Sequence, residues 1–285
     1  MTRRDHSGDQ PVGYGMRRLG ATMLTAVLVG LGLPSTATGQ WRAEPLPCRS
    51  GGQPPTTSPT RLPSQGARTC RAEPMATTRG PRPSPGYHHL GATTVDTWAG
   101  VVGRFAVTDP NVRKGTYDFV ATRFLAKRSE QKTVHWLEAG WAETGWAGAG
   151  RQRVYTFDSV RDEWRFFDQY ELTTRTRVWF HLEANTSQWR AWLWWGDAWH
   201  LLAAETLPGT GPPQIEQYVE VYVDPAESGG IELPPTDVDN VRLVDRGGET
   251  RFWRIGAVAT QPGGSTEEYC LDWRISYDTW TARTC

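Results

Sequence analysis

Two glutamates stand in the middle of segments whose side chains alternate in polarity. Glu138 lies within residues 133–141 and Glu220 within residues 215–224. An unpaired carboxylate in the middle of a strand is costly to bury. Two carboxylates that face each other push their pKa values apart, so that one is protonated while the other is ionised. We therefore predict Glu138 and Glu220 as a catalytic pair. The alternative is that each is solvated or paired with an arginine.

Aromatic side chains share the strand faces that carry these carboxylates. Successive side chains of a strand point to opposite sides, so Trp136 lies with Glu138, and Tyr218 and Tyr222 lie with Glu220. Indole faces stack on sugar rings, and carboxylates accept hydrogen bonds from hydroxyl groups. We predict a ligand-binding groove formed by Trp136, Trp179, His181, Trp192, Trp194, Tyr218 and Tyr222. The alternative is that individual tryptophans belong to the core.

The elements that must position these residues are strands. Runs rich in Val, Thr, Trp, Tyr and Phe are separated by turn-forming residues, and we find no helical stripe longer than two turns. We predict an all-β fold, a two-sheet antiparallel β-sandwich. Its expected strands are residues 98–107, 117–126, 133–141, 153–157, 177–183, 189–195, 215–224 and 241–244.

The first 88 residues differ in composition from the rest. Arg17 and Arg18 precede a short apolar stretch that ends in small residues, which is typical of a secretory signal. We predict a signal peptide over residues 1–39, a Pro/Thr/Ser-rich linker over 40–88 and the β-sandwich domain over 89–285. The protein is accordingly expected to be secreted and extracellular.

Four cysteines fit an oxidising compartment. Proximity favours the pairs Cys48–Cys70 and Cys270–Cys285, although four cysteines permit three connectivities. The second pair would close the C-terminal tail of the domain. No histidine stands at a ligand-like spacing from a cysteine, so we predict no metal site and no cofactor.

The balanced charge of the whole chain hides an uneven distribution. Residues 1–88 carry 11 basic and four acidic side chains, and residues 89–285 carry 20 basic and 27 acidic ones. Because phosphate binding needs a basic surface, an acidic domain excludes nucleic acid as its main partner. No segment after the signal is long and apolar enough to span a membrane. We expect a monomer.

Three segments, in order, resemble the glutamic peptidase family of secreted acid endopeptidases. They are the Trp-Ala-Gly segment at 97–102, the Leu-Glu-Ala-Gly segment at 137–140 and the Val-Glu-Val-Tyr-Val-Asp segment at 219–224, followed by Leu233-Pro234 and Asp237. The resemblance covers about residues 97–244. It implies a concanavalin-like (jelly-roll type) sandwich in which Glu220 matches the catalytic glutamate.

The chain departs from that family at its second catalytic position. Where the family has a glutamine, this sequence has Glu138. A neutral amide donates a hydrogen bond to a developing oxyanion, whereas an ionised carboxylate repels it. Only a protonated Glu138 would substitute, which requires acid pH or a raised pKa.

Three functions are consistent with these patterns. The first is binding of an extracellular polymer, foremost a polysaccharide, through the aromatic and acidic groove. The second is acid-active hydrolysis of a protein or another substrate by Glu138 and Glu220, as in a glutamic peptidase or another carboxylate-dependent hydrolase. The third is a non-catalytic surface interaction module whose groove is covered by residues 251–285, which include Trp253, Trp273 and Trp280.

Overall fold

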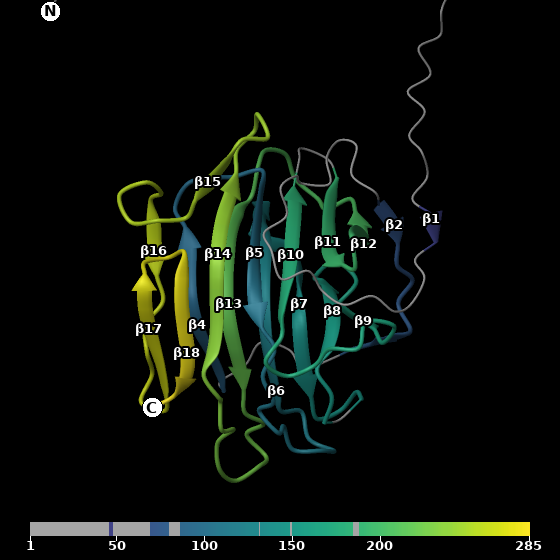
Figure 1. The fold of residues 1–285 in the computed structure, drawn as a ribbon, viewed down its shortest axis with the longest axis vertical. Coiled ribbons are helices and arrows are strands. Elements are labelled where there is room, and N and C mark those ends of the chain that lie inside the picture. The colour runs from purple at the N-terminus through teal and green to yellow at the C-terminus, as the bar shows by residue number, and fades with distance from the viewer. Residues whose placement is uncertain (1–45, 48–68, 80–85, 131, 149, 185–187) are drawn as a thin grey trace, which may run out of the picture. The chain divides into compact units, whose positions relative to one another are not determined.

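The computed structural model describes residues 46–47, 69–79, 86–130, 132–148, 150–184 and 188–285. Over these ranges the chain forms strands and no helix, arranged as two sheets (Figure 1). All strand pairs are antiparallel except for two short parallel pairs, β1 with β2 and β2 with β12. The prediction of an all-β, two-sheet antiparallel sandwich is confirmed.

The first sheet has ten strands in the described residues. Its order is β1-β2-β12-β11-β10-β5-β14-β18-β17, and β15 also pairs with β14. Its strands are β1 (Leu46–Pro47), β2 (Thr69–Arg71), β5 (Gly100–Ala106), β10 (Arg177–Ala184), β11 (Trp189–Trp195), β12 (Ala198–Glu205), β14 (Thr236–Val244), β15 (Thr250–Phe252), β17 (Tyr269–Ile275) and β18 (Thr279–Thr284).

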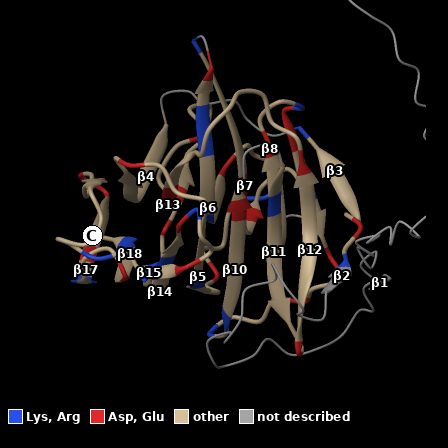
Figure 2. Cartoon of the chain, turned by 90° about the horizontal axis from the view of Figure 1, so that it is seen from above, with Lys and Arg blue, Asp and Glu red and all other residues tan. Residues whose placement is uncertain are grey.

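The second sheet has eight strands in the described residues, ordered β16-β4-β13-β6-β7-β8-β9-β3. They are β3 (Ala76–Thr78), β4 (Tyr87–Thr94), β6 (Phe119–Glu130), β7 (Thr133–Thr144), β8 (Arg153–Asp158), β9 (Glu163–Phe167), β13 (Gln214–Tyr222) and β16 (Thr260–Pro262). Viewed along the strands, the two sheets form two layers (Figure 2).

Each of the eight strands expected from alternation corresponds to an observed strand, with bounds that differ by a few residues. Several others, among them β4, β9 and β12, were not expected. β2, β3 and the start of β4 lie within residues 40–88, where the sequence predicts a linker. Their short polar runs pair mostly near sheet edges, where a strand needs little apolar surface. The described fold therefore begins before residue 89.

The main core lies between the sheets and follows the strand alternation. Val219 and Val221 of β13 and Phe180 of β10 are fully buried there, as their alternation predicts. Alternation alone does not say which face of β7 turns inward, because both faces carry aromatic side chains. In the structure Leu137, Ala139 and Trp141 lie in this core. Trp136 and Glu138 consequently lie on the opposite, outer face of the eight-stranded sheet.

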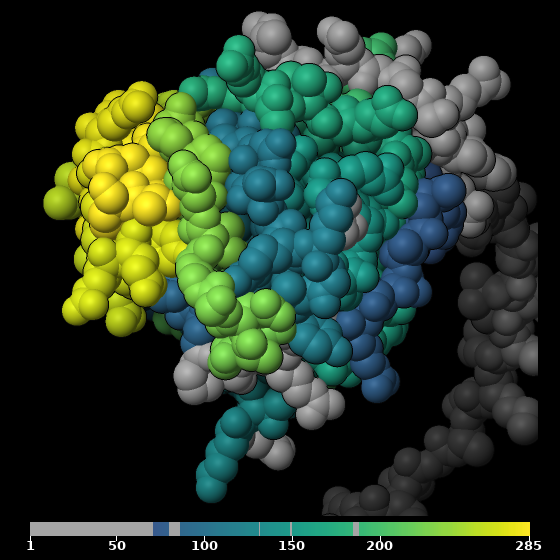
Figure 3. Space-filling view, turned by 90° about the horizontal axis from the view of Figure 1, so that it is seen from below, coloured from purple at the N-terminus to yellow at the C-terminus, as the bar shows by residue number. Residues whose placement is uncertain are grey.

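The C-terminal strands extend the first sheet at one flank, coloured yellow in Figure 3. A disulfide joins Cys270 to Cys285, which confirms that predicted pair. Cys48 and the predicted signal peptide lie outside the described residues. Within the described part of the chain, no helix has the length and apolar character needed to cross a membrane.

Candidate functional site

The two predicted glutamates lie on one face of the eight-stranded sheet. Glu138 belongs to β7 and Glu220 to β13, and β6 runs between these two strands. Leu125 of β6 is opposite Glu138, whereas Ala121 is opposite Glu220. The position midway between them on the same face of β6 is Arg123. The strand register therefore places a guanidinium group between the two carboxylates.

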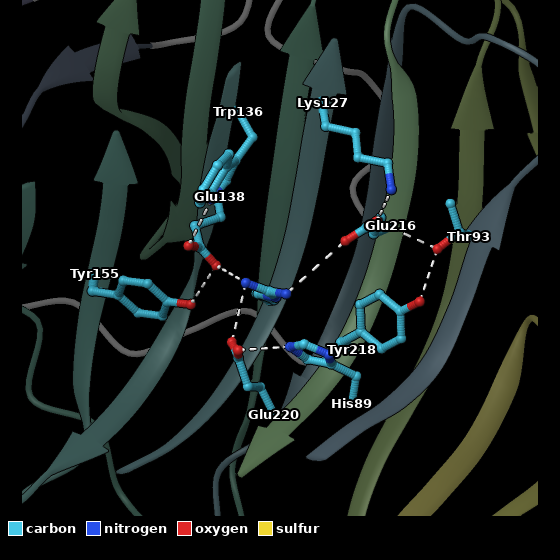
Figure 4. A network of polar contacts seen from close by, with 10 residues as sticks. His89, Thr93, Lys127, Trp136, Glu138, Tyr155, Glu216, Tyr218 and Glu220 are labelled. Atoms are coloured by element: carbon cyan, nitrogen blue, oxygen red, sulfur yellow. Dashed lines mark hydrogen bonds and ion pairs between the residues drawn. The ribbon is translucent and has the colours of Figure 1, made fainter. Parts of the chain in front are cut away.

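Arg123 bridges the pair through a single nitrogen. Its Nη1 lies 2.8 Å from Oε2 of Glu138 and 3.0 Å from Oε2 of Glu220 (Figure 4). All three side chains are buried, with Glu138 only 3% and Glu220 only 4% exposed. Buried charges need such pairing because desolvation of an unpaired ion is very costly. The ion-pair alternative for the two glutamates thus describes their contacts correctly.

Glu138 has two further donors on its own side of the cluster. Trp136 Nε1 donates to Oε1 at 3.2 Å, and the Tyr155 hydroxyl donates to Oε2 at 3.3 Å. Gly140 is the direct strand partner of both Arg123 and Tyr155. A Cβ atom at this glycine would lie 1.7 Å from the Thr122 carbonyl oxygen, so the close approach of β6 and β7 requires glycine.

Glu220 has its second partner on β4. His89 is its direct cross-strand neighbour, and His89 Nε2 lies 2.8 Å from Oε1 of Glu220. The imidazole is flanked by the rings of Tyr87 and Tyr218, at 5.8 Å and 5.4 Å between centroids. Both carboxylate oxygens of Glu220 therefore face a basic side chain.

A third carboxylate extends the network along β13. Glu216 forms an ion pair with Lys127, and its Oε2 lies 4.0 Å from Arg123 Nη2. Thr93 links Glu216 to the hydroxyl of Tyr218, at 3.4 Å and 2.8 Å respectively (Figure 4). The cluster thus contains three carboxylates and two permanently charged bases.

The environments of the two central carboxyls shift their pKa values in opposite directions. Burial raises the pKa of Glu138; the charge of Arg123 opposes this shift, and that of Glu220 adds to it. Burial also acts to raise the pKa of Glu220, but Arg123 and the hydrogen bond with His89 outweigh it, so that this pKa is lowered. Glu138 is consequently the carboxyl that takes up a proton first as the pH falls.

A hollow of about 180 Å³ opens beside this cluster. Glu220, Arg123 and Trp136 line this hollow. Glu138 does not line it, but it accepts hydrogen bonds from the lining residues Arg123 and Trp136. Arg123 Nε is buried beside the hollow and donates no hydrogen bond within the described residues. The lining consists of Tyr87, His89, Arg123, Leu125, Lys127, Val134, Trp136, Glu216 and Glu220.

The predicted binding residues are divided between the two sheets. Trp136 lines the hollow, Tyr218 lies over Arg123, and Tyr222 stacks on Phe119 in the adjoining aromatic cluster. The others, Trp179, His181, Trp192 and Trp194, lie on the outer face of the ten-stranded sheet. The expectation of one groove containing all of them is wrong, because β10 and β11 pair into the other sheet.

The residues on the ten-stranded sheet form a cluster of their own. Trp179, Trp192 and Trp199 pack together, with Trp194 against them, and the ring of His181 lies 5.9 Å from that of Trp199. His181 is 1% exposed, and neither ring nitrogen has a hydrogen-bond partner within the described residues. This burial lowers the pKa of His181 to about 3.

The burial of His181 predicts a loss of stability in acid. Because the unfolded chain binds the proton near pH 6.5 and the folded chain only near pH 3, the stabilisation present at neutral pH is lost as the pH falls between these values. The loss is about 4 kcal/mol at pH 3. Guanidinium unfolding of the wild type from pH 7 to pH 4 should show a falling free energy of unfolding. In His181→Phe, the free energy of unfolding should depend less steeply on pH. An unchanged slope in the variant would exclude His181 as its cause.

The C-terminal segment does not cover the hollow. Residues 251–285 form β16 to β18 and part of β15, and none of them lines it. Trp253 and Trp280 are instead fully buried in the main core. The covering expected under the third function is therefore wrong, because β15, β17 and β18 join the ten-stranded sheet and β16 pairs with β4 at the edge of the eight-stranded sheet.

Three basic residues of the site were not identified from the sequence: Arg123, Lys127 and His89. A signal for the first was available, since Arg123 shares its face of the predicted strand with the apolar residues Phe119, Ala121 and Leu125. A charge at such a position requires a buried partner. His89 lies outside every expected strand, so its face was not predictable.

These features define an all-β sandwich with a buried carboxylate–arginine cluster on one outer sheet face. In a structural comparison, the chain is similar to scytalidoglutamic peptidase bound to a peptide-based transition-state analogue, with a TM-score of 0.47 and 8% identity over 70% of this chain and 98% of that one. It is also similar to SCP-B, an eqolisin-family peptidase in complex with the tripeptide Ala-Ile-His, with a TM-score of 0.46 and 8% identity over the same shares. No family model and no curated protein matches the sequence. No residue's role transfers from structures this distant.

Proposed function

We propose that this protein is an acid-active hydrolase in which Glu220 is the base and Glu138 must be protonated. The observation that carries the proposal is the single Arg123 nitrogen shared by two carboxyls whose pKa values are shifted in opposite directions. Paired carboxyls with separated pKa values are the usual means of acid–base chemistry by two acidic residues.

The roles follow from the positions around the hollow. Ionised Glu220 accepts a proton from a water molecule, whose oxygen attacks the substrate carbonyl carbon, and the proton is then passed to the leaving group. Arg123 lines the hollow, so its guanidinium group is a suitable donor for the developing oxyanion. Protonation of Glu138 removes one of the negative charges around Arg123 that would repel this oxyanion.

Polypeptide is the substrate class that we propose. Its support is the sequence resemblance to glutamic peptidases around Trp98, Glu138 and Glu220. Glycans are the other substrate class that two close carboxyls can hydrolyse, so polysaccharides are included in the test.

The test is hydrolysis between pH 2 and pH 7 of a denatured protein, a peptide library and a panel of polysaccharides. We expect peptide cleavage with an optimum below neutrality, and circular dichroism at each pH separates lost activity from unfolding. Glu183→Gln is the matched control, because Glu183 pairs with Arg190 on the ten-stranded sheet, away from the hollow. Cleavage of glycans alone would show that the substrate is a glycan and not a polypeptide. If neither polypeptides nor glycans were cleaved, the hydrolase function would be excluded.

Replacing Glu138 by glutamine tests its required protonation state. In the wild type, activity should fall as the pH rises through the raised pKa of Glu138, because the ionised carboxylate repels the oxyanion. Glu138→Gln is neutral at every pH, so its activity should extend to higher pH. Profiles of kcat/KM against pH measure the shift. Loss of activity at all pH values would show that Glu138 must itself exchange a proton.

Polysaccharide binding is the second candidate, and Trp136 is the observation that favours it. Its indole lines the hollow together with Tyr87, next to Glu220. If this candidate holds, Trp136→Ala should reduce retention on a polysaccharide resin, whereas Trp194→Ala on the other sheet should not. Equal retention of the wild type and both variants would exclude this hollow as a glycan site.

A further inference from the structure

His89 connects the buried base of the site with solvent. Its side chain is 45% exposed, whereas that of Glu220, which it contacts at 2.8 Å, is only 5% exposed. Tyr87 and Tyr218 flank the imidazole, and Arg123 holds the other oxygen of Glu220. A change in the charge of His89 therefore acts directly on the carboxylate of Glu220.

The charge balance of the cluster depends on this histidine. The carboxylates of Glu138, Glu216 and Glu220 face two permanent cations, Arg123 and Lys127. A protonated His89 supplies a third positive charge, which makes the cluster neutral when all three carboxyls are ionised and positive when Glu138 is protonated, as the proposed function requires. With a neutral imidazole and an ionised Glu138, an excess negative charge stays beside the position where an oxyanion would form.

We propose that His89 is a positioning residue whose positive charge holds Glu220 and restricts the competence of the site to acidic pH. This inference rests on the proposed hydrolase function. Histidine is the side chain that changes charge between pH 5 and pH 8. In acid, the charge-assisted hydrogen bond keeps Glu220 ionised and oriented. A neutral imidazole keeps only an uncharged donor toward Glu220, which holds the carboxylate less strongly than a charge-assisted hydrogen bond.

Two substitutions separate the charge of His89 from its hydrogen bond. His89→Gln keeps a neutral donor, so we expect kcat/KM to fall about tenfold at the optimum and the acid limb to move to higher pH. His89→Arg keeps a positive charge beside Glu220 at every pH, so its acid limb should stay close to that of the wild type. His88→Gln is the matched control, because His88 points to the opposite face and contacts the exposed Glu268. The proposal would be overturned if His88→Gln shifted the limbs of the kcat/KM profile as much as His89→Gln does. It would also be overturned if the limbs were unchanged in both His89 variants.

A double-mutant cycle tests the same contact without an activity assay. Unfolding equilibria of the wild type, His89→Gln, Glu220→Gln and the double variant should show about tenfold coupling at pH 5 and much less at pH 8. Coupling that is equal at both pH values would contradict a role for the charge. If the wild type cleaves no substrate, the hydrolase proposal and the effect of His89 on hydrolysis both fail, while pH-dependent coupling would still support its hold on Glu220.

Discussion

Glu220→Gln should abolish hydrolysis at every pH, with a loss of about 10²- to 10⁴-fold in kcat/KM. An amide cannot accept the proton of the attacking water, although its oxygen can still accept a hydrogen bond from Arg123. The contacts on both sides of Glu220 are therefore largely preserved while its chemistry is removed. The substitution separates catalysis from structure more cleanly than a truncation to alanine.

The measurement is initial-rate hydrolysis from pH 2 to pH 7, with the unfolding midpoint of each variant recorded under the same conditions. Glu183→Gln, which removes a carboxylate from an ion pair on the other sheet, should leave the rates unchanged. If Glu220→Gln keeps activity within tenfold of the wild type while folded, Glu220 is not the base.

Arg123→Met should destabilise the fold by about 3–5 kcal/mol at neutral pH. The guanidinium is the shared partner of Glu138 and Glu220, and its loss leaves two buried carboxylates without their central cation. Breaking a buried ion pair from one side costs far more than losing an exposed pair. Arg283→Met, which breaks the exposed contact with Asp272, should cost less than about 1 kcal/mol.

The pH dependence of this loss has a defined sign. Without Arg123, burial raises the folded-state pKa of both carboxyls, so the variant gains stability relative to the wild type as they bind protons. The difference between the two proteins should therefore narrow as the pH falls from neutrality toward the ordinary glutamate pKa of about 4.3. Urea unfolding at pH 7 and pH 4 measures both effects. A difference below about 1 kcal/mol at pH 7 would show that the bridge stabilises little.

The positions of the two glutamates were predictable because they depend on local geometry. Side-chain direction alternates within a strand, so the sequence predicts that Glu220 lies opposite the core-facing Val219 and Val221. The same argument separates His181 from Phe180 on β10. Alternation does not say which sheet a strand joins. The prediction that the tryptophans of β10 and β11 share a groove with Glu138 and Glu220 is wrong for that reason.

The sequence by itself determined the strand content, the faces of its most regular strands and the two acidic candidates, since these follow from the two-residue period of an extended chain. Only the tertiary structure decided that Arg123 lies between the carboxyls, that His89 contacts Glu220 and that the aromatic residues divide into two clusters. Strand order and register arise from pairing between distant segments: the paired residues Tyr87 of β4 and Tyr222 of β13 are 135 positions apart (222 − 87). No local pattern in either segment specifies its partner.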